Sequence, residues 1–564
     1  MTALVTGNLP LVAGAPNGIA KLRELILALA VGGKLVAQDP SEECAQALLE
    51  ETKLVRNSLS KRPKCLATVD EDIELPAGWA RSLLANLALK LTDGSHNPPP
   101  DAGVGFPMLS SQNVRDGFVD FSSPSRFVAP EGFEKEDART RATPGDVLLT
   151  IVASIGRSAV VPRGAPRFSL QRSVAVIQTL LVPEYLCLFL RSPRAVAYYW
   201  RHAAGTAQKG IYLGKLGELA VDVPPLAEQH RIVAKVDELM ALCDRLEAQQ
   251  ADAEAAHAKL VEALLASLTQ ARDAADFRAS WHQLAEHFHA LFTTEASVDA
   301  LKQTIVHLAV MGKLVAPTEG QASSLDFLAE INAARAQYEA VPGRRTRQRA
   351  DQGVLMAPPP YPAPAGWEWR NLGSLLFITG GVTLGRKLAG RELVSLPYLR
   401  VANVQRGFLV LDQVKEIEVP ADEVEKYKLA PGDLLTTEGG DWDKVGRTAI
   451  WQGEMAQCLH QNHVFRSRPY TDKFSSRWVE LYLNSPPARD YFAGSSKQTT
   501  NLASINMTQL RACAFPVPPL AEQQQIVAVV DDLLERCNQL IVGLGLSCQR
   551  HEQLASVLVE QAVA

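Results

Sequence analysis

Two stretches of the chain have the apolar spacing of an amphipathic helix. The first stripe consists of Ile232, Val236, Leu239, Cys243 and Leu246, followed by Leu260, Leu264 and Leu268. The second consists of Ile526, Val530, Leu533, Cys537, Leu540 and Leu544. Steps of three and four residues place each set on one face of a helix, either against a neighbouring domain or in the seam of a helix pair. A first helix from Leu226 to about Leu268 would be roughly 65 Å long, longer than a small domain is wide, which favours helix pairing.

Short motifs occur twice along the chain in the same order. LAVGGKLVA at 29–37 returns as LAVMGKLVA at 308–316, and PAGW at 76–79 returns at 364–367. NVRDGF (113–118) matches NVQRGF (403–408), PGDVLLT (144–150) matches PGDLLTT (431–437), IGRSAV (155–160) matches VGRTAI (445–450), and VPPLAEQ (223–229) matches 517–523. Six ordered matches indicate a tandem duplication.

Each repeat has the same plan. A short apolar helix ends at a glycine, Gly33 or Gly312, that suits a left-handed C-cap. A polar linker follows; the second, from Pro342 to Pro364, is rich in Arg and Pro and is expected to have no fixed structure. A mixed unit comes next, and a Pro-Pro pair separates it from a long helix. Its strand-like runs include Val147–Val152, Ala175–Ile177 and Leu434–Thr437.

The repeat divides the chain into six expected segments. They are an N-terminal helical region and linker (1–75), a first mixed domain (76–225), central helices (226–316), a Pro/Arg-rich linker (317–363), a second mixed domain (364–519) and a distal helix (520–564).

Composition and charge are those of an ordinary globular protein. Hydrophobic residues make up 47% and charged residues 21%, which does not indicate disorder. A net charge of −5 argues against a protein that simply coats nucleic acid. Residues 76–225 carry +4 and residues 364–519 carry +2, so the other segments carry −11. Two mildly basic units can therefore contact phosphates through a local basic face.

Cysteine usage and apolar runs predict a cytoplasmic protein. The eight cysteines are scattered without a CxxC pair, which indicates free thiols in a reducing compartment. The early apolar run Leu25–Val31 is too short to span a bilayer, and no basic segment with a cleavage site precedes it.

Sequences that resemble catalytic signatures are incomplete. Asn97-Pro98-Pro99-Pro100 resembles the Asn-Pro-Pro-aromatic motif of adenine-N6 methyltransferases, but a proline replaces the aromatic ring that stacks on a flipped base. No glycine-rich cofactor loop and no GxxxxGK[ST] sequence is present. Both PGD sequences are interpreted as turns in which the Asp bonds nearby backbone amides.

Two histidine groups are weak candidates for metal binding. The first is Cys458, His460 and His463, whose equivalents in the other repeat are Phe168, Leu170 and Ser173. The second is His282, His287 and His289, which fall on a predicted helix beside Trp281. Because the first set is not duplicated and the second suits packing or surface positions, we predict no metal site and no catalytic constellation.

Several segments resemble one protein family. PPLAEQHRIVAKVDELMALCDRLE (224–247) and PPLAEQQQIVAVVDDLLERCNQL (518–540) resemble the conserved regions that follow the target-recognition domains of type I restriction–modification specificity subunits. TDGSHNPP (92–99) resembles the DGxHxxP element that opens many such domains. EGGDWDKVGRTAIW with CLHQNHVFR (438–451, 458–466) resembles a second type of recognition domain. The resemblance covers nearly the whole chain, and the divergence of the two domains implies two unlike half-sites.

This resemblance implies a fold and partners. The fold class is mixed α/β: two target-recognition domains in pseudo-twofold tandem repeat, separated by long antiparallel, coiled-coil-like helices. The subunit would read a bipartite double-stranded DNA target as a non-catalytic protein. It would bind two methylation subunits and the restriction subunits, and no membrane. The chain itself would hold no cofactor, with S-adenosylmethionine, ATP and Mg on the partners.

Candidate base-reading residues are polar side chains of the two mixed domains, since Arg can bond guanine and Asn or Gln can bond adenine. In the first domain they are Ser95, His96, Asn97, Arg115, Arg126, Arg157 and Arg172. In the second they are Arg386, Lys387, Arg400, Asn403, Gln405, Lys444, Arg447, Gln461, Asn462 and His463. Arg157 and Arg447 are equivalent, as are Asn113 and Asn403, so these pairs are open to a role in the fold or at phosphates instead.

Two other functions remain open from the sequence. One is the recognition part of a fused methyltransferase–nuclease, which cofactor-dependent methyl transfer by the chain alone would support. The other is a helical scaffold whose mixed domains bind proteins. Gel shifts on random duplexes with the methylation partner present separate DNA reading from this scaffold role.

The central helix is predicted to set the gap between the half-sites, because a helix has a fixed rise per residue. Inserting four residues within Ala251–Ala258 lengthens it by about 6 Å, near two base pairs of B-DNA. A map of methylated sites is expected to show a gap longer by about two base pairs. An unchanged gap would contradict this role.

Overall fold

The computed structural model describes residues 9–59, 64–66, 74–205, 208–316, 323–341, 355–386, 388–440, 444–499 and 502–563. The chain divides into two compact units, Met1–Glu254 with Leu546–Ala564 and Ala255–Gly545. Each unit combines one mixed domain with a group of helices, so the predicted mixed α/β class is confirmed.

The mixed domain of the first unit contains three sheets. Strands β1 and β9, the first and last of the domain, form an antiparallel pair. A four-stranded antiparallel sheet has the order β2-β8-β5-β6, and a three-stranded sheet has the order β4-β3-β7, with β3 and β7 parallel. The bounds are β1 Ala80–Leu83, β2 Ala88–Asp93, β3 Phe106–Leu109, β4 Arg126–Val128, β5 Val147–Thr150, β6 Ser158–Val160, β7 Ser169–Leu170, β8 Val174–Thr179 and β9 Ala220–Val223.

The second unit repeats this topology. β10 pairs with β21, the larger sheets have the orders β11-β18-β14-β16 and β13-β12-β17, and β12 is parallel to β17. A further sheet, β15-β20-β19, corresponds in the first domain to two isolated antiparallel bridges, Val152–Gly210 and Ala204–Gly210. The bounds are β10 Glu368–Asn371, β11 Leu376–Thr379, β12 Leu393–Leu399, β13 Lys415–Pro420, β14 Leu434–Thr437, β15 Gly439–Gly440, β16 Thr448–Ile450, β17 Leu459–His460, β18 Val464–Pro469, β19 Lys497–Thr499, β20 Leu502–Ser504 and β21 Ala514–Val517.

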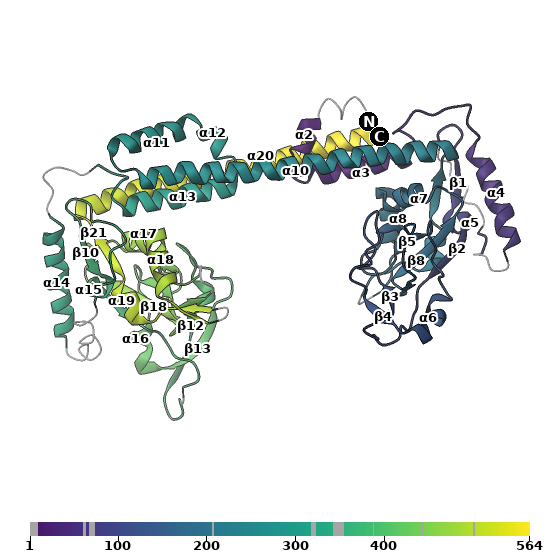
Figure 1. Ribbon diagram of the computed structural model, residues 1–564. Coiled ribbons are helices and arrows are strands. Elements are labelled where there is room, and N and C mark those ends of the chain that lie inside the picture. The colour runs from purple at the N-terminus through teal and green to yellow at the C-terminus, as the bar shows by residue number, and fades with distance from the viewer. Residues whose placement is uncertain are drawn as a thin grey trace. The chain divides into compact units, whose positions relative to one another are not determined.

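Short helices accompany the sheets of both domains (Figure 1). In the first domain they are α5 Leu84–Leu87, α6 Pro130–Asp137, α7 Pro183–Arg191, α8 Pro193–His202 and α9 Leu213–Gly217. In the second they are α15 Leu372–Leu375, η2 Val401–Asn403, η3 Ala421–Glu423, α16 Val424–Tyr427, α17 Ser476–Asn484, α18 Pro486–Ser495 and α19 Met507–Ala512.

Strand β5 is buried on both faces, which explains its continuous apolar sequence. Val147 and Leu149 belong to the core that includes Phe189 of α7. Leu148 belongs instead to the core on the opposite face, with Leu109 of the three-stranded sheet. The domain is therefore layered as helices, four-stranded sheet and three-stranded sheet, and a central strand has no polar face.

The PGD sequences form the predicted turns. Asp146 Oδ2 accepts a hydrogen bond from Thr143 N at 3.0 Å, and Asp433 Oδ2 accepts one from Ala430 N at 2.8 Å. Both carboxylates are buried, and each also forms an ion pair, with Lys90 or Arg468. Their contacts therefore stabilise the turns.

Two long helices contribute segments to both units. In the first unit the start of α10 packs with α3 and with the end of α20, in a cluster that includes Ile232 and Ala555. In the second unit the end of α10 packs with α13 and with the start of α20, in a cluster that includes Leu265 and Val530. Each bundle therefore contains helices of both repeats. The bounds are α2 Leu9–Ala13, α3 Gly18–Val31, α4 Ala45–Ser58, α10 Leu226–Gln270, α11 Ala274–Glu286, α12 Phe288–Leu291, α13 Glu295–Val310, α14 Ser324–Ala340 and α20 Leu520–Val563.

The first long helix is confirmed, but part of its predicted stripe is wrong. Leu260 is 52% exposed, whereas Val261 and Leu265 are buried. Before the Ala-rich stretch at residues 251–258, α10 packs on α3, and after this stretch it packs on α13. The buried stripe shifts with this change of partner, which regular spacing does not specify.

The predicted linker at 317–363 is also partly wrong. Within it, α14 begins after Ser323, whose hydroxyl caps Leu325 N at 3.1 Å, and its Phe327 stacks edge-on against Phe474. Further on, the Tyr361 hydroxyl donates to Val310 O at 2.5 Å, so the end of the linker is fixed as well. The part expected to lack fixed structure includes residues 342–354, which lie outside the described residues.

Three duplicated motifs meet at one contact in the first unit. Gly33 follows α3 with φ 68°, and a Cβ there would lie 2.5 Å from Pro76 Cγ and 3.2 Å from Trp79 Cζ2. The indole N–H of Trp79 donates to Glu228 Oε2 at 3.1 Å, in the first turn of α10. The Gly-Lys, PAGW and PPLAEQ motifs therefore form a single structure, here called the Trp–Glu joint.

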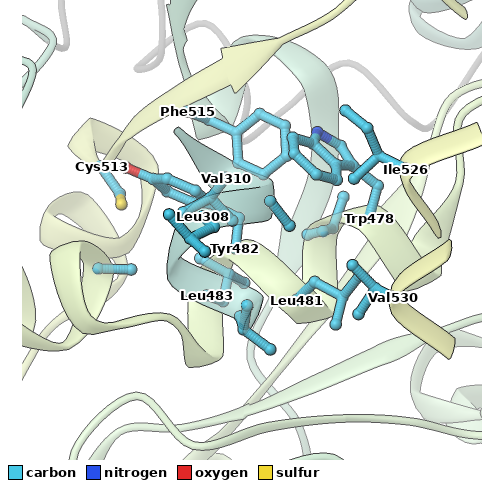
Figure 2. Packing of buried hydrophobic residues seen from close by; sticks show 14 of the residues in the cluster. Leu308, Val310, Trp478, Leu481, Tyr482, Leu483, Cys513, Phe515, Ile526 and Val530 are labelled. Carbon is cyan, nitrogen blue, oxygen red and sulfur yellow. The ribbon is translucent and has the colours of Figure 1, made fainter. Parts of the chain in front are cut away.

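The second unit contains the same joint. Gly312 has φ 66°, and a Cβ there would lie 2.8 Å from Pro364 Cγ. The Trp367 indole donates to Glu522 Oε1 at 3.0 Å in the first turn of α20. Trp367 belongs to a large apolar cluster and contacts Trp478 edge-on. Figure 2 shows Trp478, Tyr482, Phe515, Val310 and Ile526 of this cluster packed together.

The glutamine that follows each of these glutamates binds the domain itself. Gln229 Oε1 accepts from Val182 N at 2.8 Å, and Gln229 Nε2 donates to Pro224 O at 2.9 Å. In the second unit Gln523 Oε1 accepts from Ser475 N at 3.1 Å. Each long helix is thus fastened to its domain by adjacent Glu and Gln side chains.

The joint makes stability depend on pH. Burial raises the pKa of Glu228 above its ordinary value of 4.5, against the effect of the Trp79 hydrogen bond. A carboxyl with a raised folded pKa stabilises most below its unfolded pKa, and this stabilisation is lost as pH rises through the folded value. We expect Glu228→Gln, which keeps an acceptor for Trp79, to flatten that fall and to make the variant more stable than the wild type at neutral pH.

Urea unfolding midpoints between pH 4.5 and pH 8 measure this effect. Glu262→Gln removes an exposed carboxyl from the same helix and is the matched control, with an expected wild-type pH slope. A wild-type slope for Glu228→Gln as well would contradict the prediction.

Candidate nucleic-acid interface

In both domains a loop crosses the backbone of the strand opposite. In the first, Ser95 N donates to Leu170 O at 2.7 Å and Arg172 N donates to Ser95 O at 2.9 Å. A Cβ on Gly94 would lie 2.2 Å from Leu170 O, so this close crossing requires glycine. The crossing brings together two predicted residues, Ser95 and the exposed Arg172.

The second domain has the same crossing with different side chains. Val382 N donates to His460 O at 2.7 Å, and Asn462 N donates to Val382 O at 2.9 Å. A Cβ on Gly381 would lie 1.9 Å from His460 O. The predicted residues Gln461 and Asn462 are therefore held beside this loop, and the exposed His463 follows them.

A charged cluster surrounds the first crossing. His96 Nε2 lies 2.9 Å from Asp93 Oδ2, and the Arg139 guanidinium bonds both the carbonyl oxygen and the carboxylate of Asp93. Asp93 is buried, whereas His96, Asn97 and Arg139 are exposed. Sequence reasoning missed Arg139, which comes from the segment after α6 and belongs to none of the duplicated motifs.

The second crossing has a different cluster. His463 Nδ1 pairs with the half-buried Glu438, and Asn462 Nδ2 lies 3.5 Å from His463 Nε2. Glu438 was also missed; it follows the PGDLLTT strand directly. Lys444 is half-buried nearby, and its carbonyl accepts from Thr437 Oγ1 at 3.0 Å.

The NVRDGF and NVQRGF segments form β-turn hairpins. Asn403 is buried: its Oδ1 accepts from Arg400 N at 2.9 Å and its Nδ2 donates to Val410 O at 2.8 Å. The Asn403 side chain thus stabilises the hairpin through backbone hydrogen bonds. A role in the fold was one of the two interpretations left open for the equivalent pair Asn113 and Asn403. Arg447 Nη1 donates to Gln405 Oε1 at 2.5 Å, which brings these two predicted residues together.

The other predicted arginines differ in exposure and partners. Arg115 is exposed on its hairpin and Arg157 is half-buried. Arg126 Nη1 donates to Pro99 O at 2.6 Å, and Arg400 Nη2 donates to Gln413 O at 3.0 Å. Both therefore support neighbouring loops.

Arg386 is committed to an ion pair. Its Nη1 donates to Glu423 Oε2 at 2.6 Å, and hydrogen bonds from Arg386 and Arg391 lower the pKa of Glu423. The adjacent prediction, Lys387, lies outside the described residues.

The Cys458–His460–His463 group does not converge. Burial lowers the pKa of His460 to about 3, and its Nδ1 lies 2.8 Å from Val464 O. Among the residues that the structure describes, no group of three His, Cys, Asp or Glu side chains is placed to hold a metal ion. Nor is any helix of that part of the chain long and apolar enough to cross a membrane.

The two domains thus share a scaffold and differ in the polar side chains that they present at equivalent loops. This arrangement defines a tandem recognition protein, with one recognition module on each long helix.

Sequence comparisons give the family. The model of the type I restriction modification DNA specificity domain matches residues 105–254 and 364–544. The type I restriction enzyme EcoAI and EcoEI specificity subunits of Escherichia coli are 30% and 29% identical, each over 97% of this chain and 94% of the relative. The chain belongs to the type I restriction–modification specificity family. Its two copies of the domain match a subunit that reads a bipartite DNA target.

Solved structures were matched as well. A chain from a study of complex assembly and conformational transition of the type I R-M system has 18% identity, covers 87% of this chain and 99% of its own length, and gives a TM-score of 0.46. The HsdS subunit from Thermoanaerobacter tengcongensis has 18% identity, covers 87% and 98%, and gives a TM-score of 0.38.

The crossings generate a prediction about half-sites. Arg172→Ala is expected to weaken discrimination at the first half-site by about 10- to 100-fold, and Asn462→Ala at the second, because a good bidentate contact contributes about 1–3 kcal/mol. DNA affinity of the assembled complex, measured on duplexes with one half-site scrambled, checks this.

Arg272→Ala is the control, since it removes a highly exposed cation outside both domains. If Arg172→Ala lost equal affinity on specific and scrambled duplexes, the side chain would contact phosphate and not a base.

Proposed function

We propose that each mixed domain reads one half of a bipartite DNA target, while the helices hold two methylation subunits and the restriction subunits. The observation that carries this proposal is the complete duplication of the scaffold, with its Trp–Glu joint and loop crossing, combined with different side chains at the crossing. One scaffold with two sets of side chains is what two unlike half-sites require.

The duplicated helices support the number of partners. Each unit contains a bundle with a short helix, the start of one long helix and the end of the other. Two surfaces related by duplication suit two copies of one partner. The chain would carry no catalysis, and S-adenosylmethionine, ATP and Mg would be bound by the partner subunits.

Exchange of one domain tests this function. Residues 80–223 are replaced by the corresponding segment of the EcoAI specificity subunit, which is 30% identical to this chain over the aligned residues. The exchange keeps Trp79 and Glu228, and therefore the Trp–Glu joint. We expect one half of the methylated sequence to change and the other half to persist. Sequencing of methylated genomic DNA gives the result, and a change in both halves would contradict independent reading.

Two measurements separate the rival functions. The chain with its methylation subunit is expected to shift a specific duplex in preference to a scrambled one, which a protein-binding scaffold would not do. Methyl transfer by the chain alone would instead indicate a fused enzyme.

A further inference from the structure

The duplicated hairpins hold their tips in the same way. Arg115 N donates to Phe118 O at 3.0 Å, and Gln405 N donates to Phe408 O at 3.0 Å. The glycine before each Phe has positive φ, and its N–H donates to the neighbouring strand: Gly117 to Ser158 O at 2.9 Å and Gly407 to Thr448 O at 3.0 Å. A buried asparagine closes the base of each hairpin.

These hairpins expose a large aromatic side chain at matched positions. Phe118 and Phe408 are each 59% exposed. A single exposed apolar residue needs no explanation, but here a fixed turn presents the same residue twice. Rigid aromatic side chains at the surface are typical centres of protein interfaces.

A pocket lies beside the second of these residues. It has a volume of about 620 Å³ and is lined by Phe408 and Ile450 together with Glu454, Arg477, Glu480 and Asp531. Arg477 bonds both Glu480 and Asp531, the latter at 2.7 Å. Three carboxylates against one guanidinium leave the pocket negative.

The charge argues against DNA as the occupant. Phosphates carry most protein–DNA hydrogen bonds and would be repelled here. In the first repeat the positions equivalent to Arg477 and Asp531 are Glu184 and Asp237, both exposed. The Arg191 guanidinium lies beside Gly117 of the hairpin, so the charges in that region are mixed. The negative pocket beside Phe408 fits a protein partner with a basic side chain, and the exposed phenyl ring is the feature that both places share.

We propose that Phe118 and Phe408 are two equivalent docking points for the methylation subunit. Each copy would place an apolar surface against the phenyl ring, and the copy at Phe408 would also place a Lys or Arg side chain toward the carboxylates of the pocket. This inference rests on the proposed function, because it assumes two methylation subunits per chain.

The test uses the full chain and the methylation subunit of the same system. Native mass measurement and titration are expected to show two bound copies for the wild type. Phe408→Ala should weaken one copy at least tenfold and Phe118→Ala the other, in keeping with an interface centre. Glu454→Lys reverses a charge in the pocket and should weaken the copy that Phe408→Ala affects.

The control is Trp281→Ala, which removes another exposed aromatic, on α11, and should leave both copies bound. If Phe118→Ala, Phe408→Ala and Glu454→Lys all bind two copies as tightly as the wild type, the docking proposal is overturned and the proposed function stands. Failure of the wild type to bind the methylation subunit overturns both. Normal subunit binding with loss of DNA affinity in the Phe variants assigns these rings to DNA and overturns the proposal.

Discussion

Both recognition domains depend on a buried hydrogen bond between an indole and a carboxylate. The acceptor, Glu228 or Glu522, is in the first turn of a long helix, and burial raises the pKa of both carboxyl groups. The donor, Trp79 or Trp367, immediately precedes the first strand of the domain. Because that strand pairs with the last strand, which leads into the helix, the joint closes the domain and orients the helix start together.

Each bundle also depends on the other repeat. In the first unit Lys21 of α3 bonds Ser556 of α20 at 2.7 Å, while Arg23 bonds Asp244 of α10 at 2.6 Å. Helices α3 and α10 belong to the first repeat, whereas α20 belongs to the second. Neither repeat therefore buries its short helix alone, and the duplication is needed for a complete core.

The sequence predicted features that depend on local rules. The C-cap glycines, the PGD turns and the start of the long helix follow from backbone geometry and regular spacing, and the structure contains them. Two features were not predicted: Leu260 is exposed, and helix α14 forms within the expected linker. Both depend on which element packs against the helix, and the spacing of apolar residues does not specify that partner. The same holds for the candidate interface: Arg139 and Glu438 reach it only through the fold, and burial of Asn403 follows from its turn.

The loop crossings allow one scaffold to present two different sets of side chains. Their geometry is held by backbone hydrogen bonds, Ser95 N to Leu170 O in one domain and Val382 N to His460 O in the other. Glycine is required where the backbones touch, so Gly94 and Gly381 are equivalent. The neighbouring side chains take no part in these bonds, and Arg172 corresponds to Asn462. Substitution there changes the side chains that the candidate interface presents without changing the fold, which lets the two copies diverge after duplication.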